Sequence, residues 1–256
     1  MTEAASCPVC TAAVPMGARF CGTCGRSLKR RPKAPRPSVM LAQDTARDWQ
    51  SVKGAMGVYG IMLVTMLPLA WLPPGDEATG ALVAGLVISV VVAIAMHKAR
   101  DIAWSRLLFR RRVHLLTWLI AGCGLSIALA CNFLYHHVAT SVFSLTPTNS
   151  LGEAFRDAGY GVGITVLCLC VMPAIFEEIA FRGIIQGRLA RVVTRTESLL
   201  ITSFAFGIIH MSLVSLPYLA ALGLLLGWLR QRSGSLVPSM VVHGVHNLVV
   251  LALGKF

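Results

Sequence analysis

Long apolar stretches alternate with short charged or turn-rich connections over most of this chain. About 20 consecutive apolar residues are what an α-helix needs to cross the hydrocarbon core of a bilayer. The pattern predicts seven such spans, with eight as the alternative, at about residues 54–72, 78–96, 115–138, 160–185, 199–214, 216–229 and 236–253. The fifth and sixth are short, so their ends are the hardest to place. The sequence therefore predicts an all-α polytopic membrane protein.

The composition agrees with a membrane protein and excludes an ordinary soluble domain. Hydrophobic residues make up 55% of the 256 residues, and charged residues only 13%, whereas a soluble domain carries about 25% charged residues. The mean hydropathy is +0.70. A net charge of +12 would suggest nucleic acid in a soluble protein. No basic stripe with interleaved aromatic residues occurs, so we expect membrane lipid and no nucleic acid as a partner.

The connections between the predicted spans differ in their Lys and Arg content. Eight basic residues lie between Arg26 and Lys53, and six lie between the second and third spans. Three follow the fourth span and two follow the sixth, while the alternate connections carry one or none. This alternation follows the positive-inside rule. It predicts a multi-pass plasma-membrane protein with a cytoplasmic N-terminus and a C-terminus outside. No signal peptide is expected, because the chain begins without a short apolar leader.

Four of the eight cysteines form two CxxC pairs near the N-terminus, Cys7 with Cys10 and Cys21 with Cys24. This spacing is typical of a tetrahedral zinc site with four thiolate ligands. The alternative is two disulfides in an exported segment, but the predicted cytosolic location favours structural zinc. Residues 1–28 thus resemble the short zinc ribbons at the N-termini of many bacterial membrane proteins. The ribbon is a candidate for binding a partner, and the identity of this partner stays open.

A basic, proline-rich segment follows the predicted ribbon. Residues 29–38 read KRRPKAPRPS, with five basic residues and three prolines, a composition typical of an extended linker. Residues 29–53 are therefore interpreted as a linker and pre-membrane segment. Residues 54–256 form the predicted membrane domain.

The fourth predicted span contains ionisable residues, which are costly inside a membrane and are therefore functional candidates. Glu178 and Arg182 are four residues apart, so they share a helix face as an ion pair. Glu177 points elsewhere and has no cation on its own helix, which suits a general base. Pro173 removes a helical hydrogen bond nearby and could kink the span. The alternative is a structural salt bridge with one carboxylate near the membrane surface.

Two later spans add histidine and asparagine. Phe206 and His210 are four residues apart in the fifth span, and His243 and Asn247 are four apart in the seventh. His246 lies near the second of these faces without an evident role. Taken singly, His210 could be a structural histidine, and Asn247 could serve helix–helix hydrogen bonding.

Taken together, these spans form a hydrolytic constellation. A carboxylate and a histidine can hold and deprotonate a water molecule. A second histidine with an asparagine can donate hydrogen bonds to a developing oxyanion. A proton or ion pathway would also use buried Glu and His side chains, but such a relay would stagger them across the membrane.

The ordered motifs EExxxR at 177–182, FxxxH at 206–210 and HxxxN at 243–247 resemble the CPBP intramembrane proteases. That family includes CAAX prenyl endopeptidases and bacteriocin-processing or immunity proteins. The resemblance covers about residues 115–254, which would be the protease-like core. It implies the following catalytic roles: Glu177 and His210 activate water, His243 and Asn247 form an oxyanion hole, and Glu178 with Arg182 supports the site.

The resemblance leaves the catalytic type and the substrate open. The family has been described as glutamic and as metal-dependent, and a Glu/His/His set could also hold zinc. The absence of an HExxH motif favours a metal-free water. The prediction is therefore an intramembrane endopeptidase acting on a peptide or protein substrate. The alternative is a non-enzymatic immunity or partner-binding protein, or a proton or ion pathway.

Overall fold

The computed structural model describes residues 5–6, 10–14, 23, 37–68, 73, 76–108, 113–143 and 151–253. The chain divides into two units, Met1–Arg47 and Asp48–Phe256. In the first unit, β1 (Ala5–Ser6) pairs antiparallel with β2 (Ala13–Val14). Of the predicted zinc ligands, Cys10 lies at the turn between these strands, while Cys7, Cys21 and Cys24 lie outside the described residues. The zinc site therefore stays a prediction.

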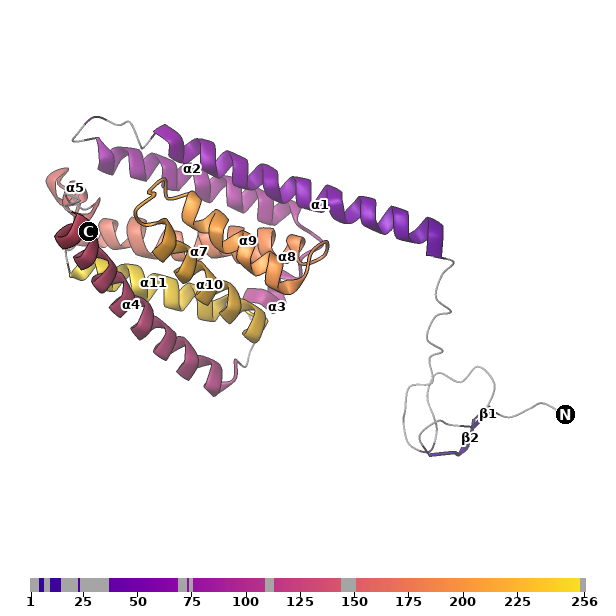
Figure 1. The fold of residues 1–256 in the computed structure, drawn as a ribbon. Helices are drawn as coiled ribbons and strands as arrows, with labels where there is room; N and C mark the ends of the chain where they lie inside the picture. The colour runs from indigo at the N-terminus through magenta and orange to yellow at the C-terminus, as the bar shows by residue number, and fades with distance from the viewer. Residues whose placement is uncertain are drawn as a thin grey trace. The chain divides into compact units, whose positions relative to one another are not determined.

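The second unit is helical (Figure 1). Its longer helices correspond to the apolar stretches of the sequence, and shorter helices lie in the connections. In chain order the helical segments are α1 (Pro37–Met66, which begins in the first unit), α2 (Glu77–Lys98), α3 (Trp104–Leu108), α4 (Leu115–Phe143), α5 (Leu151–Asp157), α6 (Val162–Val166), the π-helical η2 (Leu167–Val171), α7 (Met172–Glu178), the π-helical η3 (Ile179–Ile185), α8 (Gln186–Leu189), α9 (Arg195–Ile208), α10 (Leu216–Ser233) and α11 (Val237–Ala252).

Three helical stretches within the described residues are long and apolar enough to cross a membrane, namely Glu77–Lys98, Leu115–Val138 and Val162–Leu189. Val237–Ala252 is apolar but shorter. Large apolar side chains stay exposed along α2 and α4, for example Leu86 and Ile127. An exposed apolar surface of this kind suits lipid and not water. These findings agree with a polytopic membrane protein, while the total of seven spans stays a prediction.

The fifth predicted span ends earlier in the structure than the sequence predicted, and the helix of the first span, α1, begins at Pro37, well before residue 54. Helix α9 ends at Ile208 and does not continue to Val214, so the expectation that His210 sits within a helix is wrong. The chain must reverse between α9 and α10, and Met211 takes a positive φ of 53° in this connection. The side-chain oxygen of Ser212 then accepts a hydrogen bond from the backbone N–H of Ser215. The reversal uses residues that hydropathy alone assigned to the helix.

The core of the second unit surrounds the helix that runs from α6 to α8. Phe181, Ile184 and Ile185 are fully or almost fully buried in it, and Val52 and Met62 of α1 pack in the same cluster. Tyr59 of α1 contacts the Phe181 ring edge-on at 6.2 Å and donates a hydrogen bond to the carbonyl of Ala205. The central helix is therefore enclosed by its neighbours along the half that follows Glu178.

Small residues allow α9 and α10 to pack closely. Gly223 and Gly227 are four residues apart on α10 and face α9. A Cβ atom at Gly223 would lie 3.0 Å from the Cα of Ser203, and one at Gly227 would lie 2.5 Å from a methyl group of Leu199. This is the small-xxx-small pattern by which membrane helices bring their backbones together.

We expect Gly223→Val to destabilise the fold by about 1–3 kcal/mol, because the added carbons press on the Ser203 backbone. Gly122→Ala in α4 is the matched control, since a Cβ atom there meets nothing within 4 Å. It should leave stability unchanged or raise it by up to about 1 kcal/mol through helix propensity. Thermal unfolding in one detergent measures both. Equal melting temperatures for the two variants would contradict the close packing.

Candidate active site

The helix that carries both glutamates is not a uniform α-helix. Two π-helical segments, η2 and η3, flank the α-helical turn that ends at Glu178. Pro173 lies in the first turn of α7. In an α-helical pattern the carbonyl of Leu169 would accept a hydrogen bond from residue 173, and proline has no N–H to give. π-helical turns often occur at functional sites, and here they lie directly before and after the turn that carries both glutamates.

Glu178 is the centre of a buried polar cluster. Its Oε1 accepts a hydrogen bond from Nη1 of Arg182 at 2.8 Å, and the side chains of both residues are completely buried. The same oxygen lies 3.1 Å from Nδ1 of His243. Arg182 also donates to the carbonyl of Gly223 and lies over the Phe206 ring, 4.4 Å from its centroid. The predicted Glu178–Arg182 ion pair is thus confirmed, and it ties the fourth predicted span to the sixth and seventh.

Glu177 lies on a different face, at the wall of a cavity. The volume of this cavity is about 340 Å³, and His210, His243 and Asn247 also line it. Oε2 of Glu177 is 4.0 Å from Nε2 of His243 and has no hydrogen-bond partner among the described residues. The ring of His243 therefore lies between the two glutamates, with Nδ1 toward Glu178 and Nε2 toward Glu177.

His210 is oriented by a backbone carbonyl. Its Nδ1 lies 2.8 Å from the carbonyl oxygen of Phe206, and the two rings are in edge-to-face contact at 4.9 Å. A carbonyl can only accept, so Nδ1 must carry a proton. In the neutral ring the other nitrogen, Nε2, is then an acceptor. The four-residue spacing found in the sequence therefore persists as a contact, although His210 lies beyond the end of α9.

Asn247 belongs to a second hydrogen-bonded chain. Its Nδ2 donates to the carbonyl of Leu169, the group that Pro173 leaves without an α-helical donor. Its Oδ1 lies 3.1 Å from Nδ1 of His246, and Nε2 of His246 contacts the hydroxyl of Tyr218. The consistent assignment is Tyr218 donating to His246, and His246 donating to Asn247. This arrangement leaves the second N–H of the Asn247 amide free of these contacts.

The candidate site therefore includes two residues that the sequence did not reveal as functional. Tyr218 carries no signal in the sequence, because its partner His246 is 28 positions away on another helix. His246 stood out only by its place between the two motif residues. The other six candidates lie together: four line the cavity, and Glu178 and Arg182 lie buried behind it.

We expect Tyr218→Phe to lower kcat for the reaction proposed below about fivefold with little change in KM, because losing one hydrogen bond of about 1 kcal/mol loosens Asn247. Tyr135→Phe is the matched control, since the Tyr135 hydroxyl donates to the carbonyl of Val214 and not to His246 or Asn247. Kinetic parameters of both variants decide the matter. Equal losses in the two variants would assign Tyr218 to folding alone.

Comparison with known proteins covers the segment that carries the candidate residues at this cavity. Residues 161–249 match the family model described as type II CAAX prenyl endopeptidase Rce1-like. A relative from Bacillus subtilis (strain 168), named "Putative membrane peptidase YdiL", is 28% identical over 136 residues. These residues are 53% of this chain and 55% of the relative, so the chain spans about half the length of the curated relative that it matches. No solved structure matches the chain significantly.

The matched segment contains all six candidate catalytic residues, from Glu177 to Asn247. The family model and the relative are both described as peptidases, and the apolar helices agree with a protein in a membrane.

Proposed function

We propose that this protein is an intramembrane endopeptidase of the CPBP type, which hydrolyses a peptide bond of a membrane-associated substrate with a water molecule activated by Glu177. The observation that carries the proposal is the meeting of Glu177, His210, His243 and Asn247 at one cavity of about 340 Å³. These side chains come from three separate segments of the chain. A carboxylate, two histidines and an amide at one cavity wall supply both the base and the hydrogen-bond donors that amide hydrolysis needs.

In the proposed mechanism, Glu177 and His210 hold the attacking water. Nε2 of His210 accepts one of its hydrogen bonds, because Nδ1 is committed to the Phe206 carbonyl. The unpartnered Oε2 of Glu177 takes a proton as the water oxygen bonds to the carbonyl carbon. Glu177 then returns this proton to the leaving nitrogen as the C–N bond breaks. The products are a carboxylic acid and an amine, which exchange the remaining proton to become a carboxylate and an ammonium group, and no other reactant is consumed.

His243 and Asn247 are proposed to stabilise the oxyanion of the tetrahedral intermediate. Asn247 offers the amide N–H that Leu169 does not use. His243 donates through Nδ1 to Glu178, so Nε2 can donate to the oxyanion only when the ring carries both protons. Glu178 and Arg182 act by holding the His243 ring in place.

The proposed mechanism uses no catalytic metal. No three His, Cys, Asp or Glu side chains in the described part of the chain converge closely enough to hold a metal ion. We propose zinc only for the N-terminal ribbon, with Cys7, Cys10, Cys21 and Cys24 as ligands and a structural role. The proposed location is the plasma membrane with the ribbon in the cytosol.

The test is cleavage of membrane-anchored peptides by the full-length protein in phospholipid nanodiscs prepared in ¹⁸O-labelled water. Hydrolysis is expected to place one ¹⁸O atom in the new carboxyl group, which mass spectrometry detects. A parallel sample contains a zinc chelator, and a third sample carries Cys21→Ser and Cys24→Ser. We expect cleavage to persist in all three samples.

The outcomes separate the candidate functions. Cleavage lost with chelator but retained in the cysteine variant would place an essential metal outside the ribbon and overturn the metal-free mechanism. Absence of cleavage across a broad peptide library, together with proton flux through the protein in vesicles, would overturn the protease and favour a proton pathway.

A further inference from the structure

A second pocket lies at the end of the central helix, away from the candidate active site. Its volume is about 650 Å³. Its walls come from the connection after α2, from α3, from the far end of the central helix and from the end of α10. We call it the arginine pocket, because Arg106, Arg191 and Arg230 line it together with a single carboxylate, Asp101. None of these residues takes part in the proposed hydrolysis.

The one carboxylate is already neutralised. Asp101 contacts Nη1 of Arg191 at 2.8 Å and Nη2 of Arg188 at 3.2 Å. Partial burial raises the pKa of Asp101, but the adjacent Arg188 and Arg191 outweigh this effect and bring the pKa below its ordinary value. Asp101 therefore stays charged and paired at neutral pH, and it has no charge to spare for the other two arginines.

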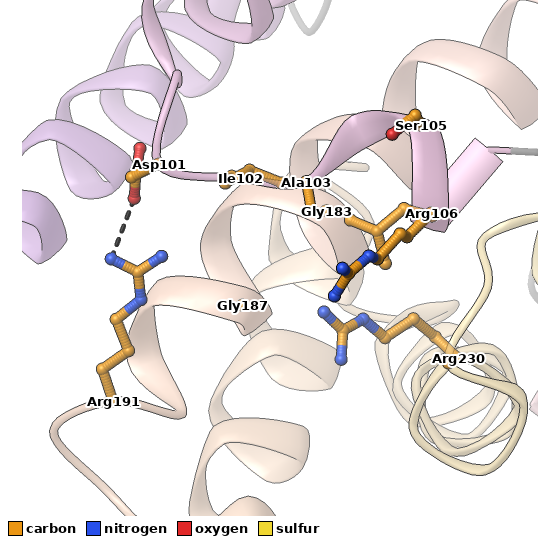
Figure 2. A pocket seen from close by; sticks show the side chains of 11 residues that line it. Asp101, Ile102, Ala103, Ser105, Arg106, Gly183, Gly187, Arg191 and Arg230 are labelled. Atoms are coloured by element: carbon orange, nitrogen blue, oxygen red, sulfur yellow. Dashed lines mark ion pairs between the residues drawn. The ribbon is translucent and has the colours of Figure 1, made fainter. Parts of the chain in front are cut away.

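Arg106 and Arg230 face each other without a carboxylate between them (Figure 2). Neither has an ion-pair partner among the described residues. The Nε of Arg230 is buried and has no hydrogen-bond partner there. Two facing cations, one of them with a buried unpaired donor, repel each other unless an anion lies between them. The arginine pocket therefore has more hydrogen-bond donors and positive charge than the described side chains around it can pair with acceptors and negative charge.

Two glycines of the central helix make room for this arrangement. Gly183 and Gly187 are four residues apart and both line the pocket. A Cβ atom at Gly187 would lie 3.6 Å from Nη2 of Arg230, and one at Gly183 would lie 2.9 Å from the Trp104 ring. The absence of side chains on this helix face lets Arg230 and α3 approach it and leaves the cavity open.

The position of the arginine pocket favours a lipid. The three connections that carry most of the basic residues of the membrane domain meet here, and they end the spans on the predicted cytoplasmic side. The anionic headgroups of the inner leaflet lie at this level. Trp104 of α3 lies beside the pocket and donates to the carbonyls of Met96 and Ala99, and tryptophan is enriched at the membrane–water interface.

We propose that the arginine pocket binds the phosphate group of an anionic phospholipid headgroup, with Arg106 and Arg230 as its main donors. A phosphate offers several acceptor oxygens to the planar fork of each guanidinium, which makes arginine the preferred residue for such a group. The acyl chains would remain in the bilayer beside α3. This site is independent of the proposed hydrolysis.

The experiment measures binding of a fluorescent phosphatidylglycerol to the delipidated full-length protein in a neutral detergent. We expect saturable binding, and at least about tenfold weaker binding for Arg106→Gln and for Arg230→Gln, since each loses charge-assisted hydrogen bonds. Arg232→Gln is the matched control. It removes the same charge two residues from Arg230, where the guanidinium stacks on Trp228 and does not line the pocket.

Two further binding measurements distinguish a lipid headgroup from free inorganic phosphate as the ligand. Phosphatidylcholine is expected to bind weakly, and millimolar inorganic phosphate is expected to displace the lipid poorly. If inorganic phosphate displaces the lipid at concentrations well below millimolar, the site would be reassigned to a soluble phosphate. Equal weakening by Arg232→Gln, or equal binding of phosphatidylcholine, would overturn the proposal in favour of general surface charge. Arg106 is exposed, so its variant tests the site even if Arg230→Gln lowers the melting temperature.

Discussion

Replacing Glu177 with glutamine is expected to reduce peptide cleavage by roughly 10²–10⁴-fold, the usual contribution of a general base. Glutamine keeps the shape of the side chain, but its amide cannot accept a proton from water. The same change should not weaken the fold. Oε2 of Glu177 has no hydrogen-bond partner among the described residues, and an ionised carboxylate inside a membrane costs about 2.5–3.5 kcal/mol on insertion scales. Glu177→Gln is therefore expected to unfold at the wild-type temperature or above it.

This combination of lost activity and retained stability is the distinctive part of the prediction. Glu178→Gln is the matched control, because it makes the same chemical change one residue away. Glu178 contacts Arg182 and His243 in the buried cluster, so its variant should lose both activity and stability. Initial rates and melting temperatures of the two variants in one lipid mixture make the comparison. Full activity in Glu177→Gln would eliminate Glu177 as the base.

Local periodicity predicted the parts of the site that lie on one helix. The Glu178–Arg182 pair follows from four-residue spacing, and the structure confirms it. The contact between His210 and Phe206 also follows that spacing, although the helix ends before His210. Hydropathy could not place that end, because residues 209–214 are largely apolar while forming a turn.

Contacts between helices were not available from periodicity. The approach of His243 to both glutamates joins positions about 65 residues apart, and before the structure these motifs were brought together by their shared chemistry and by the family resemblance. The Tyr218–His246 contact had no such guide. Asn247 donates to the Leu169 carbonyl, which lacks an α-helical donor because residue 173 is proline. Neither residue alone indicates this contact. In each case the missing information is which helix faces which.

The pairing of individual arginines around the arginine pocket was also not available from the sequence. Counting basic residues by connection predicted an orientation for the chain, and it treated every arginine in those connections alike. The structure separates them. Arg188 and Arg191 pair with Asp101, Arg232 stacks on Trp228, and Arg106 and Arg230 are left facing a cavity. Among the described residues, Arg106 and Arg230 line the cavity and have no ion-pair partner.

Arg182→Met is expected to lower the free energy of unfolding by about 3–5 kcal/mol, the usual cost of removing one partner from a buried ion pair. Arg182 is completely buried and carries three interactions at once: with Glu178, with the Gly223 carbonyl and with the Phe206 ring. Methionine fills part of the space but leaves the Glu178 carboxylate without its cation. The uncompensated charge, more than the lost packing, is expected to dominate the loss.

A second variant separates these two causes. The double variant Glu178→Gln/Arg182→Met removes the stranded charge and is expected to recover part of the stability that Arg182→Met loses. Asp101→Asn breaks a more exposed ion pair and should cost no more than about 1 kcal/mol. Denaturant titration of these three variants, of Glu178→Gln and of the wild type in mixed micelles gives the comparison. If the double variant is as unstable as the sum of its single changes, the pair is not coupled, and packing around Phe206 becomes the reason for keeping Arg182.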